Sequence, residues 1–252
     1  MPVPAIPATE LHLVEVFSSL QGEGVLIGRR QLFVRLADCN LACIYCDTPH
    51  AAGPIWRAEQ EPGSAKLIEQ PNPASLETLT ELIIDWQAKL PVHQALVLTG
   101  GEPLLQSRVL AAWLPRVACV LPVYLETNGT LPEALAEVLA HITWVSMDLK
   151  LAQLTGEPTP WAAHAAFLQV AGLKTLQIKV VIDATVSAAE LIDAAAFVQR
   201  HAPDVPLILQ PRTVAGRPAV TGLQLLSLQA AAARNHLNTL VIPQLHPLLA
   251  ID

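Results

Sequence analysis

The stretch Cys39-Asn-Leu-Ala-Cys43-Ile-Tyr-Cys46-Asp-Thr48 places three cysteines within eight residues, in a C-x3-C-x2-C spacing. Clustered thiolates are ligands for soft metals. A structural zinc site normally has four protein ligands, and the remaining cysteine, Cys119, lies far away in an apolar run. Three thiolates would hold a four-iron four-sulfur cluster and leave one iron open to a substrate or cosubstrate. The spacing therefore predicts chemistry at such a cluster. A zinc knuckle completed by a distant histidine or aspartate, or a redox disulfide, is the alternative.

Composition narrows the class of protein. The chain of 252 residues is long enough for one large α/β domain, and because it is 52% hydrophobic and 15% charged, most segments are expected to be buried elements. A net charge of −7 with 15 Lys and Arg provides no basic surface for nucleic acid. The sequence has no signal-peptide pattern and no run of about 18 apolar residues. We expect a soluble cytoplasmic protein without nucleic-acid or membrane partners.

Apolar segments that alternate with helical patterns predict a parallel sheet. Right-handed crossovers between such strands would give a sheet of roughly six or seven strands within a single domain over residues 1–252. A proline-rich segment at about 49–73 is predicted to be an irregular insertion. Strands are expected over residues 11–17, 31–37, 95–99, 120–126, 142–149, 176–182, 205–210 and 239–244, and helices over 76–86 (after the N-cap Ser75), 132–140, 188–200 and 222–235.

Polar and glycine-rich motifs follow several of these strands. Gly100-Gly101-Glu102-Pro103 and Thr127-Asn128-Gly129 each come directly after a strand, as the cysteine loop does. Parallel α/β folds place their sites at the carboxyl ends of strands. A full or partial barrel would bring these loops to one cavity, and a flat doubly wound sheet would also collect some of them.

The motifs together resemble those of the radical S-adenosylmethionine superfamily, whose members have a partial or modified (βα) barrel with parallel strands. There the cysteine loop holds a four-iron four-sulfur cluster, and a GGEP-like motif lies against the methionine end of S-adenosylmethionine. The stretches that resemble the narrower 7-carboxy-7-deazaguanine synthase family are Ser19-Leu-Gln-Gly-Glu-Gly24, Phe33-Val-Arg35, Cys46-Asp-Thr48 and Gln244-Leu-His246.

The resemblance implies a reaction. Cys39, Cys43 and Cys46 would ligate the cluster, and S-adenosylmethionine would occupy the open iron. A 5′-deoxyadenosyl radical would take hydrogen from C6 of 6-carboxy-5,6,7,8-tetrahydropterin. Ring contraction with loss of ammonia would give 7-carboxy-7-deazaguanine for queuosine and other 7-deazapurine biosynthesis. The resemblance also implies Mg2+ at Thr48, flavodoxin or ferredoxin as electron donor, and a homodimer.

The resemblance and the residue types together predict two sets of binding residues. The planar guanidinium of Arg35 suits a substrate carboxylate, unless a core pairing with Asp38 or Glu23 occupies it. Lys150 and Lys179 could lie near the cavity, or instead at the surface or at a strand edge. Cys119 is expected to be a small buried hydrophobe. The predicted residues for S-adenosylmethionine are Tyr45, Asp47, Gly100, Gly101, Glu102, Thr127, Asn128, Gly129 and Lys179, and those for the substrate are Leu20, Gln21, Gly22, Glu23, Arg35, Thr99, Gln244, His246 and Asp252.

Two other functions are compatible with part of this pattern. An activating enzyme for a glycyl-radical protein would share the cysteines and GGEP, but would need neither SLQGEG nor the CDT tail. A non-catalytic iron-sulfur or zinc module would leave the glycine motifs after the other strands unexplained.

Overall fold

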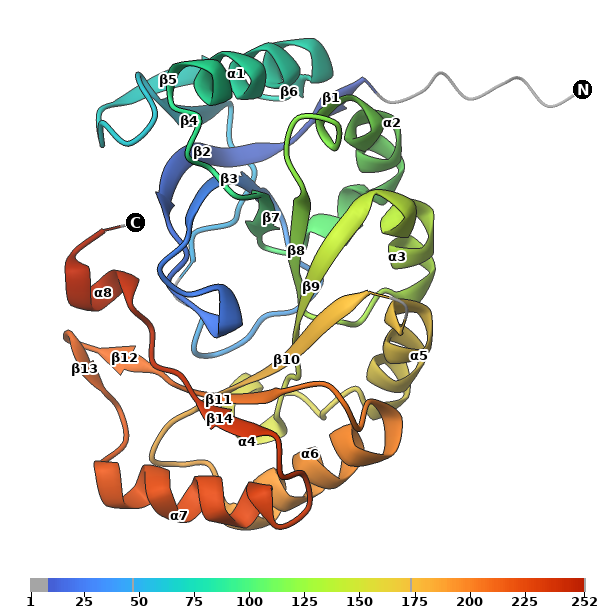
Figure 1. Cartoon of the computed structure of the whole chain (residues 1–252), viewed down its shortest axis with the longest axis vertical. Coiled ribbons are helices and arrows are strands. Elements are labelled where there is room, and N and C mark those ends of the chain that lie inside the picture. The colour runs from blue at the N-terminus through green and yellow to red at the C-terminus, as the bar shows by residue number, and fades with distance from the viewer. Residues whose placement is uncertain (1–8, 47, 173, 252) are drawn as a thin grey trace, which may run out of the picture.

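A curled sheet of ten strands organises the computed structural model, which describes residues 9–46, 48–172 and 174–251 (Figure 1). Seven of these strands, from β14 (Thr239–Val241) to β3 (Arg30–Leu36) in the order below, run parallel to one another, as predicted. The next strand, β2 (Leu13–Leu20), runs antiparallel to β3. The two outermost strands, β14 and β5, do not pair with each other in the described chain, so the barrel is partial. The strand order is β14 (Thr239–Val241), β11 (Leu207–Pro211), β10 (Thr175–Ile182), β9 (Ile142–Asp148), β8 (Val123–Thr127), β7 (Leu96–Gly100), β3 (Arg30–Leu36), β2 (Leu13–Leu20), β4 (Ile55–Glu59) and β5 (Leu67–Pro71).

Helices cover the outer face of the curled sheet (Figure 1). The predicted N-cap is confirmed, because the Ser75 hydroxyl accepts a hydrogen bond from the Thr78 backbone N–H at 3.1 Å. The helices are α1 (Leu76–Lys89), α2 (Ser107–Val117), α3 (Pro132–Val138), α4 (Ala152–Thr155), α5 (Trp161–Ala171), α6 (Ala188–His201), α7 (Gly222–Ala233) and α8 (His246–Leu249). Short 3-10 turns are η1 (Gly24–Leu26), η2 (Pro103–Gln106) and η3 (Leu139–His141). Two small antiparallel ladders pair β1 (Glu10–Leu11) with β6 (Ala74–Ser75) and β12 (Thr213–Val214) with β13 (Arg217–Pro218).

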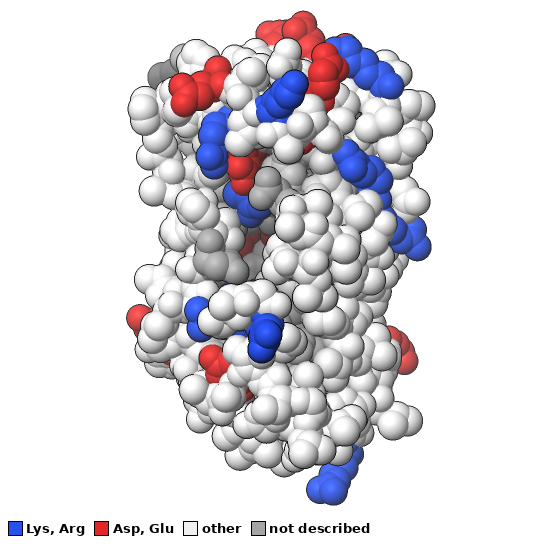
Figure 2. Space-filling model, turned by 90° about the vertical axis from the view of Figure 1, so that its left-hand side faces the viewer, with Lys and Arg blue, Asp and Glu red and all other residues white. Residues whose placement is uncertain are grey.

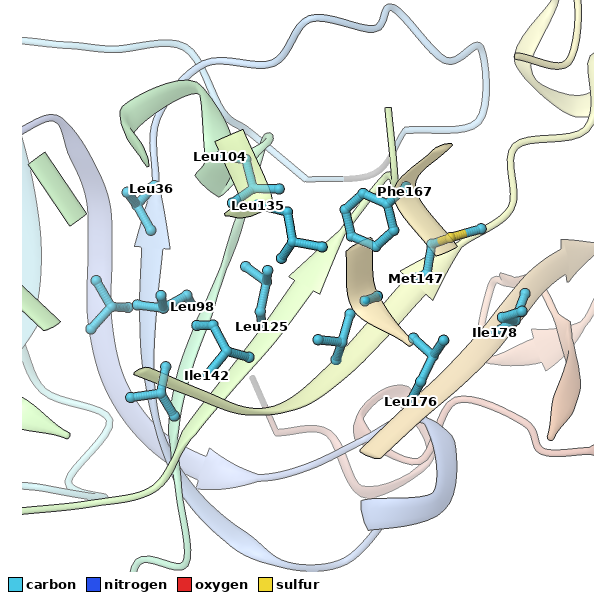
Figure 3. Close-up of a cluster of buried hydrophobic side chains, with 14 of the residues drawn as sticks. Leu36, Leu98, Leu104, Leu125, Leu135, Ile142, Met147, Phe167, Leu176 and Ile178 are labelled. Atoms are coloured by element: carbon cyan, nitrogen blue, oxygen red, sulfur yellow. The ribbon is translucent and has the colours of Figure 1, made fainter. Parts of the chain in front are cut away.

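The apolar core lies between the sheet and these helices (Figure 3). Leu98 and Leu125 come from adjacent strands and meet helix residues such as Leu135 and Phe167, and all four are fully buried. Successive side chains of a strand point to opposite faces. The residues that alternate with this core are therefore directed to the inner face of the curl, and many of them are polar.

The prediction of an irregular segment at 49–73 is wrong for much of its length, because β4 and β5 form an antiparallel hairpin there. The carboxylate of Glu59, 5% exposed, accepts hydrogen bonds from the backbone N–H groups of Gly63 and Ala65 at 2.7 and 2.8 Å. Trp56 is 2% exposed. The buried Glu59 carboxylate thus orders the turn, and the buried Trp56 anchors the open end of the hairpin through its hydrogen bond to the Pro71 carbonyl, in a segment whose prolines and glycines had suggested irregular structure. The single-domain organisation stays a prediction.

Three further differences are local. The strand expected over residues 120–126 begins at Val123, after Pro122. Cys119, predicted to be buried, is exposed, and its thiol donates to the Arg116 carbonyl at 3.2 Å. Helices α2 and α5 were not predicted; Pro115 interrupts the pattern of α2, and α5 is rich in alanine. No helix within the described ranges is both long and apolar enough to cross a membrane.

Candidate active site

The inner face of the sheet and the loops after its strands enclose a cavity of about 260 Å³. Figure 2 views the open side of the curl, where the surface is hollowed and charged side chains lie around the opening. Glu102 and Gly129 are not among the described residues that line this cavity, and Asp47 and Asp252 lie outside the described residues. The predicted residues that line it are Leu20, Gln21, Gly22, Glu23, Arg35, Cys39, Cys43, Tyr45, Cys46, Thr48, Thr99, Gly100, Gly101, Thr127, Asn128, Lys179, Gln244 and His246.

The cysteine loop and the Gly-Gly turn form one unit. The Gly101 N–H donates to the Leu36 carbonyl at 3.2 Å, and the Glu102 N–H donates to the Asp38 carbonyl at 2.8 Å. A Cβ on Gly101 would collide with the backbone of Asp38. Glycine is required there because two backbones approach closely. The loop that carries the thiols is therefore held against the turn that follows β7.

The donor set of this wall suits a cluster with a bound cosubstrate. Cys39 and Cys43 are half-buried and Cys46 is exposed, and all three line the cavity. Among the described residues, no three His, Cys, Asp or Glu side chains converge to hold a single metal ion. Two buried cavity oxygens, Asp148 Oδ1 and Gln210 Oε1, have no hydrogen-bond partner within the described chain. Three thiols that line one cavity are the donor type that holds an iron-sulfur cluster, and the unpaired oxygens can accept hydrogen bonds from a ligand.

Glu102 lies behind the cavity wall, although the sequence suggested that it binds the cosubstrate directly. Its carboxylate is fully buried. It accepts from the Leu104 N–H at 3.0 Å, the Thr127 hydroxyl at 2.9 Å and the Asn128 N–H at 2.7 Å. Burial raises the pKa of Glu102, and these donors act against that rise. Glu102 thereby fixes the Thr127-Asn128 turn, which does line the cavity.

A half-buried ion pair joins the Gly-rich loop to β10. Lys179, predicted to contact S-adenosylmethionine, donates to the Glu23 carboxylate, and Gln244 Nε2 donates to the same carboxylate at 3.0 Å. Burial alone would raise the pKa of Glu23, but the charge of Lys179 and the hydrogen bonds lower it to about 2. The Leu245 N–H donates to the Gly22 carbonyl at 2.8 Å. The C-terminal segment is thus fastened to the loop that carries the predicted substrate residues.

We expect the Glu23 carboxylate to make stability depend on pH in the acid range. Its native pKa of about 2 lies below its ordinary value of 4.5, so its contribution is fully present above pH 4.5 and is lost as the pH falls through 2. The expected contribution at neutral pH is about 3 kcal/mol. Urea unfolding of the protein and of Glu23→Gln from pH 6 to pH 2 measures it.

The free-energy difference between the two proteins should shrink across that window. Glu133→Gln, at an exposed position of α3, is the control for the loss of one carboxylate. A Glu23→Gln difference that stays constant with pH would contradict the prediction.

Sequence reasoning missed Glu126, which lines the cavity between Gln21 and Thr99. Its carboxylate accepts from Gln21 Nε2 at 2.9 Å and from the Thr99 hydroxyl at 2.8 Å. Burial raises the pKa of Glu126. Its position in the sequence could have identified it as a site residue, because Glu126 immediately precedes the Thr-Asn-Gly turn at the carboxyl end of β8.

Lys150 and Tyr45, both suggested by the sequence, lie beside the cysteine loop together with Asp148, which the sequence did not suggest as a site residue. Lys150 donates to the Tyr45 hydroxyl at 2.8 Å and to Asp148 Oδ2 at 2.6 Å, and all three residues line the cavity. Burial would lower the pKa of Lys150, but Asp148 and Tyr45 hold it well above its ordinary value. Neither Lys150 nor Lys179 is a surface lysine, so the surface alternative is wrong for both.

The chain is similar to known proteins in sequence and in fold. Residues 34–186 match the Radical SAM superfamily. The chain is 42% identical to the "7-carboxy-7-deazaguanine synthase" of Geobacter sulfurreducens, over 95% of this chain and 96% of that protein. The chain belongs to the 7-carboxy-7-deazaguanine synthase family. A second member of this family, from Methanothermobacter thermautotrophicus, is 42% identical over 56% of this chain and 50% of its own length.

A solved structure supports the fold. The crystal structure of QueE from Escherichia coli superposes with a TM-score of 0.57 at 21% identity, covering 94% of this chain and 95% of that one. Membership of the 7-carboxy-7-deazaguanine synthase family, within the radical SAM superfamily, implies a four-iron four-sulfur cluster and S-adenosylmethionine. The three thiols in the cavity wall are the residues of this chain that fit the cluster.

Proposed function

We propose that this protein converts 6-carboxy-5,6,7,8-tetrahydropterin to 7-carboxy-7-deazaguanine, with loss of ammonia, as a carbon-nitrogen lyase of queuosine or other 7-deazapurine biosynthesis. One observation supports it most. In a chain 42% identical to a named synthase over 95% of its length, one cavity is lined by the three thiols and by Arg35 and Gln21. That arrangement puts soft metal ligands and groups suited to a carboxylated pterin around the same space.

Cys39, Cys43 and Cys46 would hold the cluster. With S-adenosylmethionine bound, the cluster supplies one-electron cleavage and a radical able to abstract hydrogen. The chain's own contribution is to bind and orient. The backbone at Gly100 and Gly101 and the turn fixed by Glu102 form the adjoining wall for the cosubstrate.

The opposite part of the cavity would bind the substrate. Arg35 supplies a permanent positive charge for its carboxylate. The amide of Gln21 and the carboxylate of Glu126 supply hydrogen-bonding groups for the pterin edge. Glu126 is half-buried and its pKa is raised by burial, so its hydrogen bonds to a ligand would help to discriminate between ligands.

Four finer assignments belong to the same proposal. Thr48 would contact Mg2+ beside the substrate carboxylate, since a hydroxyl oxygen suits this hard cation. Flavodoxin or ferredoxin would deliver the electron, the protein would act as a homodimer, and it would work in the cytoplasm. Each rests on the family and needs its own measurement.

An anaerobic assay of the reconstituted protein tests the proposed function. The mixture contains reductant, S-adenosylmethionine, Mg2+ and the carboxytetrahydropterin, and mass spectrometry follows the deazaguanine product and 5′-deoxyadenosine. Product with little net 5′-deoxyadenosine is expected, because family members regenerate the cosubstrate. Cleavage of S-adenosylmethionine without pterin turnover would favour another radical reaction, such as activation of a glycyl-radical protein. Absence of cleavage with the cluster in place would favour a binding module.

A further inference from the structure

Three charged side chains at the edge of the cavity form a chain of ion pairs, called here the Arg-Glu-Arg cluster: Arg35, Glu15 and Arg57. Glu15 Oε1 contacts Arg35 Nε at 2.8 Å, and Glu15 Oε2 contacts Arg57 Nη2 at 3.2 Å. Arg35, on β3, lines the cavity, whereas Arg57, on β4, does not. The alternative pairing of Arg35 with Asp38 or Glu23 is not what the structure shows. The hairpin once expected to be irregular therefore reaches the site through Glu15.

Arg35 is held from more than one side. Its guanidinium carbon lies 5.4 Å from the centre of the Phe17 ring, which stacks on Phe33 at 4.9 Å. Glu15 engages Nε, and no ion pair to the two terminal nitrogens is found among the described residues. That end of the fork has the geometry for a bidentate carboxylate. The side chain is therefore oriented before any ligand arrives.

The charge of this cluster depends on Arg57. Arg35 and Glu15 alone form a neutral pair, which would attract a carboxylate weakly. Arg57 adds a second cation to the same carboxylate, and the three groups together carry one positive charge. The side chains of Arg35 and Glu15 are 20% and 19% exposed, and that of Arg57 is 45% exposed. Salt and water therefore screen the charges of Arg35 and Glu15 less than that of Arg57.

We propose that Arg57 is a specificity-determining positioning residue, which offsets the negative charge of Glu15 so that this charge does not cancel the attraction of Arg35 for a carboxylated substrate. This inference rests on the proposed function. Strand pairing fixes the contact, because Glu15 and Arg57 are directly paired in the parallel β2-β4 ladder. Glu69, exposed on β5, is the antiparallel partner of Arg57 and presents a competing carboxylate. Arg57 acts through Glu15 and does not touch the ligand.

A series of substitutions at position 57 tests the charge argument on the reconstituted holoenzyme. Arg57→Lys keeps the charge, Arg57→Met removes it and Arg57→Glu reverses it. Lys66→Met removes one positive charge from an exposed position of the same hairpin and is the matched control. Fluorescence titration gives the Kd of 6-carboxypterin and of pterin without the carboxylate, and steady-state assays give KM and kcat with the substrate.

The Kd for 6-carboxypterin and the KM should rise about fivefold in Arg57→Met and about twentyfold in Arg57→Glu. They should stay near the parent values in Arg57→Lys and Lys66→Met. Binding of pterin and kcat should change less than about twofold. Added salt should reduce the differences.

Equal weakening of both pterins, or no change in Arg57→Met, would overturn the inference. Failure of the parent protein to turn over the substrate would instead reject the proposed function, while the Kd comparison would still decide the role of Arg57. Circular dichroism and the graded series keep the test valid if one variant fails to fold.

Discussion

Cys43→Ala is expected to abolish the radical chemistry, with S-adenosylmethionine cleavage reduced at least about a thousandfold. The three thiols of the loop after β3 are the soft donors that line the cavity, so loss of one leaves only two protein ligands for the cluster. With two cysteines a second iron would have no protein ligand, and a cluster held so incompletely is readily lost. Anaerobic reconstitution should give iron content and visible absorption well below those of the parent protein. Iron and sulfide analysis, absorption spectra and 5′-deoxyadenosine yield provide the measurements.

Cys119→Ala is the matched control. Its thiol is exposed, lies after α2 and bonds to the Arg116 carbonyl at 3.2 Å, away from the residues that line the cavity. Iron content and cleavage should equal those of the parent protein. A Cys43→Ala protein that keeps a complete cluster and cleaves S-adenosylmethionine would mean that another side chain ligates the third iron.

Most of the fold could be predicted because its strands are short apolar runs that alternate with helical patterns. The seven parallel strands and the capped helix α1 follow from that pattern alone. The β4-β5 hairpin could not be predicted, because Glu59 organises its turn through contacts that sequence does not display. The low strand propensity of a segment with several prolines favoured irregular structure, but burial of its side chains against the rest of the fold determines the hairpin.

The candidate site was predictable where motifs stand at strand ends and less so where partners are distant in sequence. The spacing of the thiols and the Gly100-Gly101 pair predicted that they meet at one cavity, and they line it; their binding roles stay predictions. The ion pair of Lys179 with Glu23 could not be predicted, since the two residues lie 156 positions apart in the chain, and contact of Lys179 with S-adenosylmethionine stays a prediction. Glu15 and Arg57 belong to no motif in the sequence, Arg57 lies in the segment predicted to be irregular, and only the β2-β4 register brings the two together.

Glu102→Gln is expected to cost about 3 kcal/mol of stability and to weaken S-adenosylmethionine binding at least tenfold. Both carboxylate oxygens accept backbone donors, Oε1 from the Leu104 N–H and Oε2 from the Asn128 N–H. Whichever way a glutamine amide turned, its NH2 group would face one of these donors in a fully buried site. The Thr127-Asn128 turn would then shift, and with it part of the cavity wall. Urea unfolding and equilibrium binding to the reconstituted protein measure the two effects.

Glu137→Gln makes the same chemical change at an exposed position of α3, where the carboxylate accepts from the Ser107 hydroxyl at 2.7 Å. It should cost less than about 1 kcal/mol, because water can replace the lost interaction. Direct contact between Glu102 and the cosubstrate would give another pattern, in which affinity falls while stability without cosubstrate stays unchanged. If Glu102 acts through its hydrogen bonds, stability and cosubstrate affinity should fall together. The same three donors stabilise the native chain and fix the part of the cavity wall against which the cosubstrate would lie.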